Sequence, residues 1–478
     1  MSSLSSCDGL DCQARVRRVN RKIDIALLPI LSILYLFNGL DRSNVGNAET
    51  QGFSTDIGAT PDDLNLAVSL FFVTFVLLQP LSAGVGRWLG AKHWITMMML
   101  GWGTFTVAHA FTRGKASLLT LRLLVGAFEA GFFPTAVIYL STFYCSYDLA
   151  VRIALFYGQY AVAGAFSGSI AYGIFHIKTS TLYNWQLLFV IEGELTILLG
   201  VISWFWLPRG PEEAWFLCES DRQYVATRVL SDITTSSCDT DASTKPKLSK
   251  RDVKETIKDW KLWYVLVFNI CASVPSQAFS VFLPLVVQGL GYSSLQANLM
   301  SVPPYVCGAT ILYLFALSSD YRRERGCHII GGISIMLVGL LITTLCTSTR
   351  ARYAGLCILL SGSYVHGPLT TAWLIGNTPE PGKRALVLGV NGFGNLAGVI
   401  GGQLYKHRYA PEYRLPFYIT LGFVATALLG YTSYRFTLQA VNKRRAKILA
   451  SKDVAQIEQE RTDDVRYADR KWTFQYGV

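Results

Sequence analysis

Charged residues are scarce in this chain. Of its 478 residues, 16% are Asp, Glu, Lys or Arg and 51% are hydrophobic. A soluble globular protein carries roughly 25% charged residues. The few charges gather in short polar segments that separate long apolar stretches. This pattern excludes an ordinary water-soluble fold and indicates helices that cross a lipid bilayer.

Several kinds of functional site are also missing. The ten cysteines include no C-x-x-C pair, so neither a disulfide framework nor a metal site is expected, and no cofactor is predicted. The net charge of +11 lies in loops rather than on a soluble domain, which argues against nucleic-acid binding. No nucleophile and base pattern and no phosphate-binding loop stands out, so the chain is predicted not to be an enzyme.

Twelve stretches are long and apolar enough to cross the roughly 30 Å of hydrocarbon in a bilayer. The sequence therefore predicts an all-α integral membrane protein with twelve transmembrane helices in two six-helix bundles. The expected spans are residues 24–44, 63–83, 94–111, 118–142, 152–175 and 186–206 in the first half, and 262–288, 296–318, 327–347, 353–376, 385–404 and 416–436 in the second.

The polar segments divide the chain further. A Ser-, Thr- and Asp-rich run (SDITTSSCDTDASTK) in the longest internal connection has too little apolar content to fold, so this linker is expected to be flexible. The charges of the tail are expected to form a solvated surface. The expected parts are an N-terminal segment 1–22, a bundle 23–207, a linker 208–261, a bundle 262–437 and a tail 438–478.

Basic residues set the expected orientation. Five of them, from Arg15 to Lys22, precede the first apolar run, and most other Lys and Arg fall on the same side of the membrane. Both termini are therefore expected in the cytoplasm. Lys406, Arg408 and Arg414 fall on the opposite side, and the sequence offers no account of them.

Several motifs resemble those of one transporter family. The first span carries LDRSNVGNA, the fourth RLLVGAFEAGFFP and the sixth NWQLLFVIEG, and the second half adds ANLMSVPPY, SDYRRER and WLIGN. In these motifs the chain resembles the major facilitator superfamily, and within it the anion:cation symporter branch and its fungal allantoate permease-like transporters. The resemblance covers about residues 20–435. It implies a monomeric, multi-pass transporter of the plasma membrane, with a small anionic solute and protons as its partners.

The chain departs from the family pattern at a few positions. Leu81-Ser82-Ala83 stands where the family has Pro-Ser-Asn, Thr135 replaces a glycine, and Asp148 replaces the usual glutamate. These departures are compatible with a changed substrate.

The fourth span holds two ionisable residues, which normally face a partner or a water-filled cavity inside a membrane. Arg122, Gly126 and Glu129 share one helical face. Arg122 and Glu129 are separated by roughly 10.5 Å of helical rise and so cannot pair directly. The family resemblance implies that Arg122 binds the anion and that Glu129 couples transport to protons. Alternatively, both are structural locks to neighbouring helices.

Other polar residues in the first half have two interpretations as well. Asp41 and Arg42 either line the outward mouth, with Arg42 and Arg122 attracting a carboxylate, or form an ion pair that ends the first helix. Glu192 in the sixth span is interpreted first as a structural contact.

In the second half, Gln277, His366, Asn391 and Asn395 are the candidate substrate-binding residues. Gln277 and His366 lie close to prolines, which let spans bend around a cavity, and the two asparagines share one helical face. His366 is alternatively a neutral packing residue.

One connection resembles the superfamily's cytoplasmic gating loop. It contains Asp320, Arg322, Arg323 and Arg325, which would close the inner face by ion pairs. Anchoring at the membrane surface alone would explain the arginines but not Asp320.

The leading hypothesis is proton-coupled uptake of a small organic anion, such as a carboxylate, vitamin or ureide, by alternating access. The superfamily's antiporter signature is missing from the fifth span, where Ala165 follows Gly164, and this favours uptake. Efflux of a secondary metabolite by the same fold is the first alternative. A solute receptor that transports nothing is the second.

Overall fold

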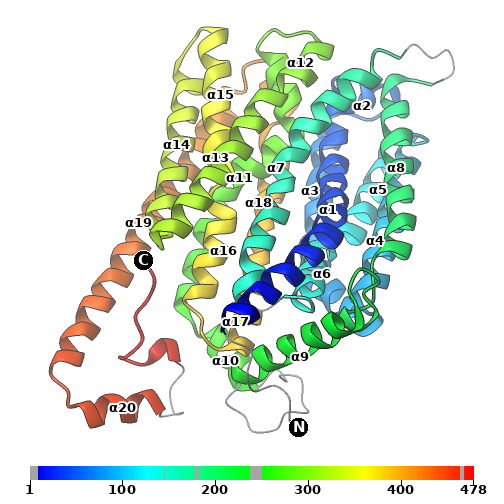
Figure 1. Ribbon diagram of the computed structural model, residues 1–478. Helices are drawn as coiled ribbons and strands as arrows, with labels where there is room; N and C mark the ends of the chain where they lie inside the picture. The colour runs from blue at the N-terminus through cyan, green and yellow to red at the C-terminus, as the bar shows by residue number, and fades with distance from the viewer. Residues whose placement is uncertain (1–8, 145, 178–181, 237–249, 463–467) are drawn as a thin grey trace.

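The computed structural model describes residues 9–144, 146–177, 182–236, 250–462 and 468–478. These residues form helices and connecting turns, with no β-strand among them. Figure 1 shows the long helices standing side by side. The short helix α2 (Phe53–Asp56) and α12 (Ser294–Met300) lie at one end of the bundle, and α9 (Glu219–Ser236) and α10 (Lys250–Ile257) lie at the other. We call these the α2–α12 end and the α9–α10 end.

The long helices follow the expected order of twelve spans. Eight of them are long and apolar enough to cross a membrane by length and composition. The all-α fold with two groups of six spans is therefore confirmed. The first group consists of α1 (Gly9–Glu49), α3 (Pro61–Leu89), α4 (Ala91–His109), α5 (Gly114–Glu129) with α6 (Phe132–Ser141), α7 (Ser146–Ile174) and α8 (Asn184–Trp206). The second consists of α11 (Trp260–Gly289), α12 with α13 (Val302–Arg322), α14 (Gly326–Leu345), α15 (Thr349–Ser363) with α16 (His366–Gly376), α17 (Pro381–Asn391) with η2 (Gly392–Leu396) and α18 (Ala397–Leu404), and α19 (Arg414–Ala450).

Several spans are interrupted along their length. The fourth breaks between α5 and α6, directly after Glu129, and the tenth breaks at Tyr364 between α15 and α16. Pro134 and Pro368 follow these breaks, and a proline cannot donate the backbone hydrogen bond of a continuous helix. The eleventh span passes through the 3₁₀ turn η2 instead. The candidate residues Glu129, His366, Asn391 and Asn395 therefore lie at or next to these helix breaks.

A set of hydrogen bonds joins the two halves at the α2–α12 end. The Asn65 amide on α3 donates to the carbonyl of Gly402 at 2.7 Å, and the Gln403 amide donates to the Ser69 hydroxyl at 2.8 Å. Close helix packing accompanies them, because a Cβ at Gly46 of α1 would lie 1.7 Å from the carbonyl oxygen of Val281 on α11. This end of the interface between the halves is sealed.

The connection between the halves differs from the flexible linker expected for residues 208–261. Part of it forms α9 and α10, and residues 237–249 lie outside the described residues, as do residues 1–8 of the N-terminal segment. Asp221 on α9 is buried and accepts a hydrogen bond from the Lys22 ammonium at 2.8 Å. The expectation of a flexible linker was wrong for this part of it, because α9 packs against the N-terminal turns of α1.

The tail also differs from the solvated surface that was expected. Beyond α19 and α20 (Val454–Thr462), the short helix η4 (Ala468–Arg470) places Asp469 in a buried position. Asp469 accepts hydrogen bonds from the ammonium groups of Lys261 at 2.7 Å and Lys383 at 2.9 Å. Burial by itself raises the pKa of Asp469, but the two lysines outweigh burial and hold the pKa below its usual range.

The last described residues of the tail bind the second half. The Trp373 indole donates to the carbonyl of Gly477 at 2.7 Å, and the side chain of Asn377 exchanges hydrogen bonds with the backbone of the same residue. The Asn442 side chain likewise exchanges two hydrogen bonds with the Tyr476 backbone. The tail therefore connects α16 and α19 at the α9–α10 end.

Candidate transport site

A buried ion pair occupies the interior of the first half. The Arg42 Nε on α1 donates to Oε2 of Glu129, the last residue of α5, at 3.0 Å. The Arg42 side chain is 7% exposed and that of Glu129 is fully buried. A buried pair of this kind is stable only while both partners are present, because the loss of either would leave an isolated charge out of water.

Arg122 lies near this pair without joining it. It is buried on α5, on the same face as Glu129 and about two turns before it, and forms no hydrogen bond or ion pair with any described residue. Arg42 and Arg122 both line a cavity of about 10 Å³ that also touches Val281 of the second half. Such a cavity has room for about one water molecule. Two guanidinium groups therefore face the interface between the halves, and only one of them has a carboxylate partner.

Two further carboxyl groups are buried in the first half. Asp41 accepts weak hydrogen bonds from Asn44 and Thr196, both at 3.4 Å, and Glu192 is buried on α8. The alternative in which Asp41 and Arg42 pair to end the first helix is wrong. α1 continues to Glu49, two turns further, and Arg42 pairs with a residue of another helix.

Aromatic rings surround the Arg42 guanidinium. Its central carbon lies 4.4 Å from the ring centre of Phe75, 5.4 Å from that of Phe71 and 5.6 Å from that of Tyr160. The negative faces of such rings favour a cation that has been removed from water. The rings also narrow the space around Arg42.

The second half contributes a stripe of neutral polar side chains. Asn269, Ser273 and Gln277 are spaced four residues apart, so they lie on one face of α11. Sequence reasoning found Gln277 but missed Asn269 and Ser273. The four-residue spacing of polar residues within an apolar span was the signal that would have revealed them.

Each member of this stripe bonds to a residue that was a candidate from the sequence. Asn269 donates to Asn391 at 3.2 Å, and Gln277 donates to Asn395 at 2.9 Å. Ser273 lies 3.0 Å from the Nε2 of His366. The polar face of α11 therefore connects all four candidates. Gln277 lies on it, and His366, Asn391 and Asn395 contact it.

The proposed gating residues lie in the last turn of α13 and in the short connection to α14, at the α9–α10 end. Asp320 and Arg325 form an ion pair at 2.5 Å, and Arg325 also donates to the Ser319 hydroxyl at 3.1 Å. Arg322 and Arg323 are exposed. The structure therefore brings Asp320 and Arg325 together, whereas Arg322 and Arg323 remain on the surface.

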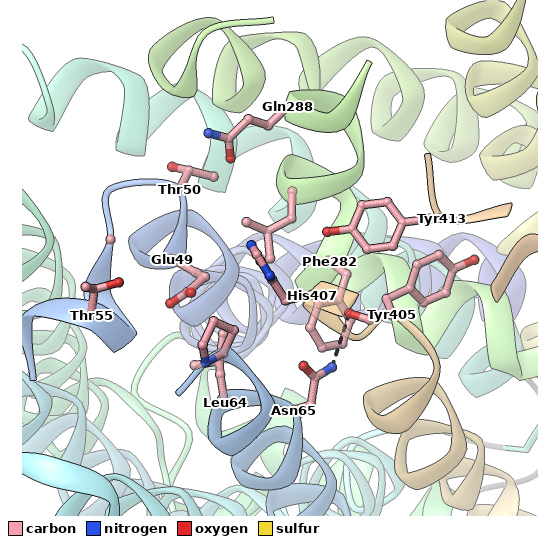
Figure 2. Close-up of a pocket in the computed structure, with 13 residues that line it drawn as sticks. Glu49, Thr50, Thr55, Leu64, Asn65, Phe282, Gln288, Tyr405, His407 and Tyr413 are labelled. Carbon is pink, nitrogen blue, oxygen red and sulfur yellow. Dashed lines mark hydrogen bonds between the residues drawn. The ribbon is translucent and has the colours of Figure 1, made fainter. Parts of the chain in front are cut away.

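A larger cavity opens at the α2–α12 end, between the two halves. Its volume is about 310 Å³. Figure 2 shows Glu49, Asn65, His407 and Tyr413 around it. Glu49 also accepts hydrogen bonds from the backbone and hydroxyl of Ser54, which hold α2 in place. Sequence reasoning did not predict this vestibule, because the segments that form it are far apart in the chain.

Twelve spans in two groups, with buried ionisable groups at the interface between the halves, are the architecture of a secondary transporter. Comparison with known families agrees. Residues 31–402 match the model of the Major Facilitator Superfamily, and the chain belongs to that family.

Fungal transporters are similar over almost the whole chain. The MFS-type transporter efuF of Hormonema carpetanum is 33% identical, with 95% of this chain and 91% of the relative covered. The high-affinity nicotinic acid transporter of Saccharomyces cerevisiae is 30% identical, with 94% and 83% covered.

Among solved structures, the xylose transporter XylE from E. coli in a partially occluded inward open conformation is similar in fold. The TM-score is 0.63 at 10% identity, with 85% of this chain and 96% of that chain covered. A likeness at this identity concerns the fold alone.

Proposed function

We propose that the chain imports a small organic anion together with protons by alternating access, as a monomer of the anion:cation symporter branch with allantoate permease-like relatives. The family resemblance favours the plasma membrane, and the basic residues before the first span favour an orientation with both termini in the cytoplasm. In this orientation the α2–α12 end is extracellular.

One observation carries the proposal. Arg42 is paired with Glu129, whereas Arg122 is buried beside the same small cavity with no partner among the described residues. An unpaired buried guanidinium is costly, and a carboxylate is the group that matches its donors best. Arg122 is therefore the residue that would first bind an incoming carboxylate.

The ion pair provides a way to couple the anion to a proton. While Glu129 is ionised, it holds Arg42. When Glu129 takes up a proton, it no longer neutralises Arg42, and the substrate carboxylate can bind both guanidinium groups. The anion and the proton then occupy the site together, so that neither is carried without the other.

The two ends of the molecule supply the alternation. For uptake, the hydrogen bonds of Asn65 and Gln403 must open so that solute passes from the vestibule of Figure 2 to Arg122. At the opposite end, the ion pair of Asp320 with Arg325 is placed to stabilise one arrangement of α13 and α14. The polar groups along α11 would contact the uncharged part of the solute.

The similar nicotinic acid transporter of Saccharomyces cerevisiae has a name that specifies an aromatic carboxylic acid. A monocarboxylate of this size is compatible with two arginines in one half and neutral groups in the other. Radiolabelled nicotinate is therefore the first solute to test.

The test is uptake into proteoliposomes by the purified wild-type protein and by Glu129→Gln. The wild type should accumulate nicotinate only when the outside is more acidic than the lumen. Glu129→Gln should lose accumulation but keep exchange of labelled for unlabelled nicotinate. Glu194→Gln, a change at an exposed glutamate on α8, is the matched control and should behave as wild type.

Accumulation that ignores the pH gradient in the wild type, or that survives in Glu129→Gln, would contradict the coupling mechanism. Flux of an intracellular product outward with no uptake would favour efflux. Binding without any flux would favour a receptor.

A further inference from the structure

A line of aromatic rings connects Arg42 to the second half. The Tyr160 ring on α7 lies 5.6 Å from the Arg42 guanidinium carbon. The Tyr364 ring of the second half meets the Tyr160 ring edge to face, with centroids 6.3 Å apart and planes at 67°. These two tyrosines bring aromatic surface of both halves next to the proposed anion site.

The hydroxyl groups of this pair are unusual for buried tyrosines. Tyr160 is 9% exposed and Tyr364 is 4% exposed, and neither hydroxyl oxygen has a hydrogen-bond partner among the described residues. Several other buried tyrosine hydroxyls are bonded, as in Tyr431 to Thr370 at 2.9 Å and Tyr305 to the carbonyl of Phe279 at 2.7 Å. Buried polar groups are nearly always hydrogen-bonded, so the exceptions need an explanation.

The polar stripe on α11 has orphan atoms of the same kind. The side-chain oxygens of Asn269 and Gln277 are buried and accept no hydrogen bond from the described residues. Like the two tyrosine hydroxyls, they are buried hydrogen-bonding groups without a partner among the described residues, and they lie on α11, which packs against α1 of the first half. A bound solute with a polar, uncharged part would satisfy them.

Tyr364 also occupies a position that changes shape easily. It lies at the break between α15 and α16, and Pro368 four residues later cannot bond to its carbonyl. The ring itself is held on one side, because a Cβ at Gly308 of α13 would lie 2.8 Å from its Cδ2. The ring can therefore be fixed against a solute while the adjoining helix moves.

Charge limits what the solute can be. Among the buried residues described in the second bundle, Lys383 alone carries a permanent charge, and it is bonded to Asp469 at the α9–α10 end. The part of the solute that faces the second half is therefore uncharged. One carboxylate bound by Arg42 and Arg122, with a neutral remainder, fits this arrangement.

We propose that Tyr160 and Tyr364 are specificity-determining residues that hold the flat ring of an aromatic monocarboxylate whose carboxylate binds Arg42 and Arg122. This inference rests on the proposed function. It adds that the protein prefers aromatic rings over saturated rings of the same size and charge, because ring-to-ring contacts supply attraction beyond simple burial.

The first test compares two probes in wild-type proteoliposomes. Benzoate and cyclohexanecarboxylate have the same charge and the same number of ring carbons, and differ in flatness and aromaticity. The expected KM for benzoate is about three- to tenfold lower, the size of an aromatic pair contribution. Equal KM values, or a preference for cyclohexanecarboxylate, would overturn the assignment without using any variant.

The second test changes the rings. Tyr364→Leu should raise the KM for benzoate more than the KM for cyclohexanecarboxylate, so that most of the benzoate preference is lost. Tyr364→Phe and Tyr160→Phe, which keep the ring, should retain the ring preference and weaken only solutes with a polar ring atom, so that nicotinate loses more than benzoate. Tyr431→Leu is the matched control, a buried tyrosine of the same half with a bonded hydroxyl, and should leave the preference unchanged.

The outcomes separate this inference from the function on which it rests. Proton-driven uptake of both probes with no ring preference would remove the role of the tyrosines and leave anion symport intact. No uptake of any carboxylate by a monodisperse wild-type protein would contradict both. If Tyr364→Leu fails to fold, the wild-type probe comparison and the two phenylalanine variants still decide the question.

Discussion

The two halves of this transporter have the same helical architecture but bury different chemistry. The interior of the first half holds carboxyl and guanidinium groups, whereas the stripe along α11 in the second half and its partners consist of amides, a hydroxyl and an imidazole. The buried charged residues of the first half are Asp41, Arg42, Arg122, Glu129 and Glu192. The polar residues of the stripe and its partners are Asn269, Ser273, Gln277, His366, Asn391 and Asn395.

This difference indicates a division of labour. Ionisable groups inside a membrane bind ions strongly and respond to protonation, so under the proposed function the first half would bind the anion and the proton. Neutral hydrogen bonds can be exchanged for others at little net change in free energy, so the second half can contact varied solutes and rearrange. Residues that set energy coupling and residues that set selectivity should then be separable by mutation.

The largest expected effect is at Arg42. Arg42→Met leaves Glu129 buried without its partner, and breaking a buried pair in this way costs about 3–5 kcal/mol. We expect a large fall in the unfolding temperature of the detergent-solubilised protein and loss of uptake. Thermal unfolding followed by intrinsic tryptophan fluorescence measures the first effect.

The double variant Arg42→Met/Glu129→Gln provides the control. It removes both charges, so stability should recover while uptake stays absent. A double variant as unstable as Arg42→Met would show that Arg42 stabilises the fold through its aromatic contacts instead of through Glu129.

An intermediate effect is expected where the linker and the tail bind the two halves. Asp469 is held by Lys383 and Lys261, which are 1% and 12% exposed, whereas Asp221 is held by Lys22, which is 39% exposed. Hydrogen bonds to charged groups are worth about 1.5–3 kcal/mol when buried. Asp469→Asn should therefore release residues 468–478 from the second half. Asp221→Asn should weaken the packing of α9 by less, because water screens its partner Lys22.

The Asp469 contact should also depend on pH. Because its pKa is lowered in the folded protein, its stabilising contribution is complete above the unfolded value of about 3.9 and is lost as the pH falls below it. Hydrogen exchange of residues 468–478, corrected for intrinsic rates, should show protection at pH 7 and pH 5 that weakens below about pH 4. Protection that is unchanged at pH 3 would contradict the role of Asp469.

The smallest effect is expected in the stripe of the second half. Asn269→Ala removes the hydrogen bond to Asn391, worth about 0.5–1.5 kcal/mol. We expect a KM for nicotinate raised by about three- to tenfold, with accumulation still driven by the pH gradient. Loss of the response to pH in this variant would show that coupling is not confined to the first half.

The sequence predicted the fold well because a membrane helix reveals itself locally, through a long apolar run with charged flanks. It also placed Arg122 and Glu129 on one helical face, since that follows from the 3.6-residue period. The pairing of Glu129 with Arg42 could not be read in the same way, because it joins residues 87 positions apart and depends on how α1 and α5 pack.

Similar reasons explain the errors outside the membrane. Asp469 belongs to a tail whose charges were expected to be solvated, and Asp221 belongs to a linker that was expected to be flexible. Both are buried, and each accepts a hydrogen bond from a lysine far away in the sequence. Lys383 donates to Asp469, and Lys22 donates to Asp221. The outer vestibule and the Tyr160–Tyr364 contact were missed for the same reason. Both are formed by residues of the two halves together, and the sequence does not show which residues of one half contact which residues of the other.

A structure of the protein determined with nicotinate bound would test the division of labour most directly. Our account requires the carboxylate within hydrogen-bond distance of Arg122 or Arg42, and the ring against Tyr160 and Tyr364. A carboxylate bound instead by Asn391, Asn395 or His366, with the arginines still dry and unengaged, would contradict it.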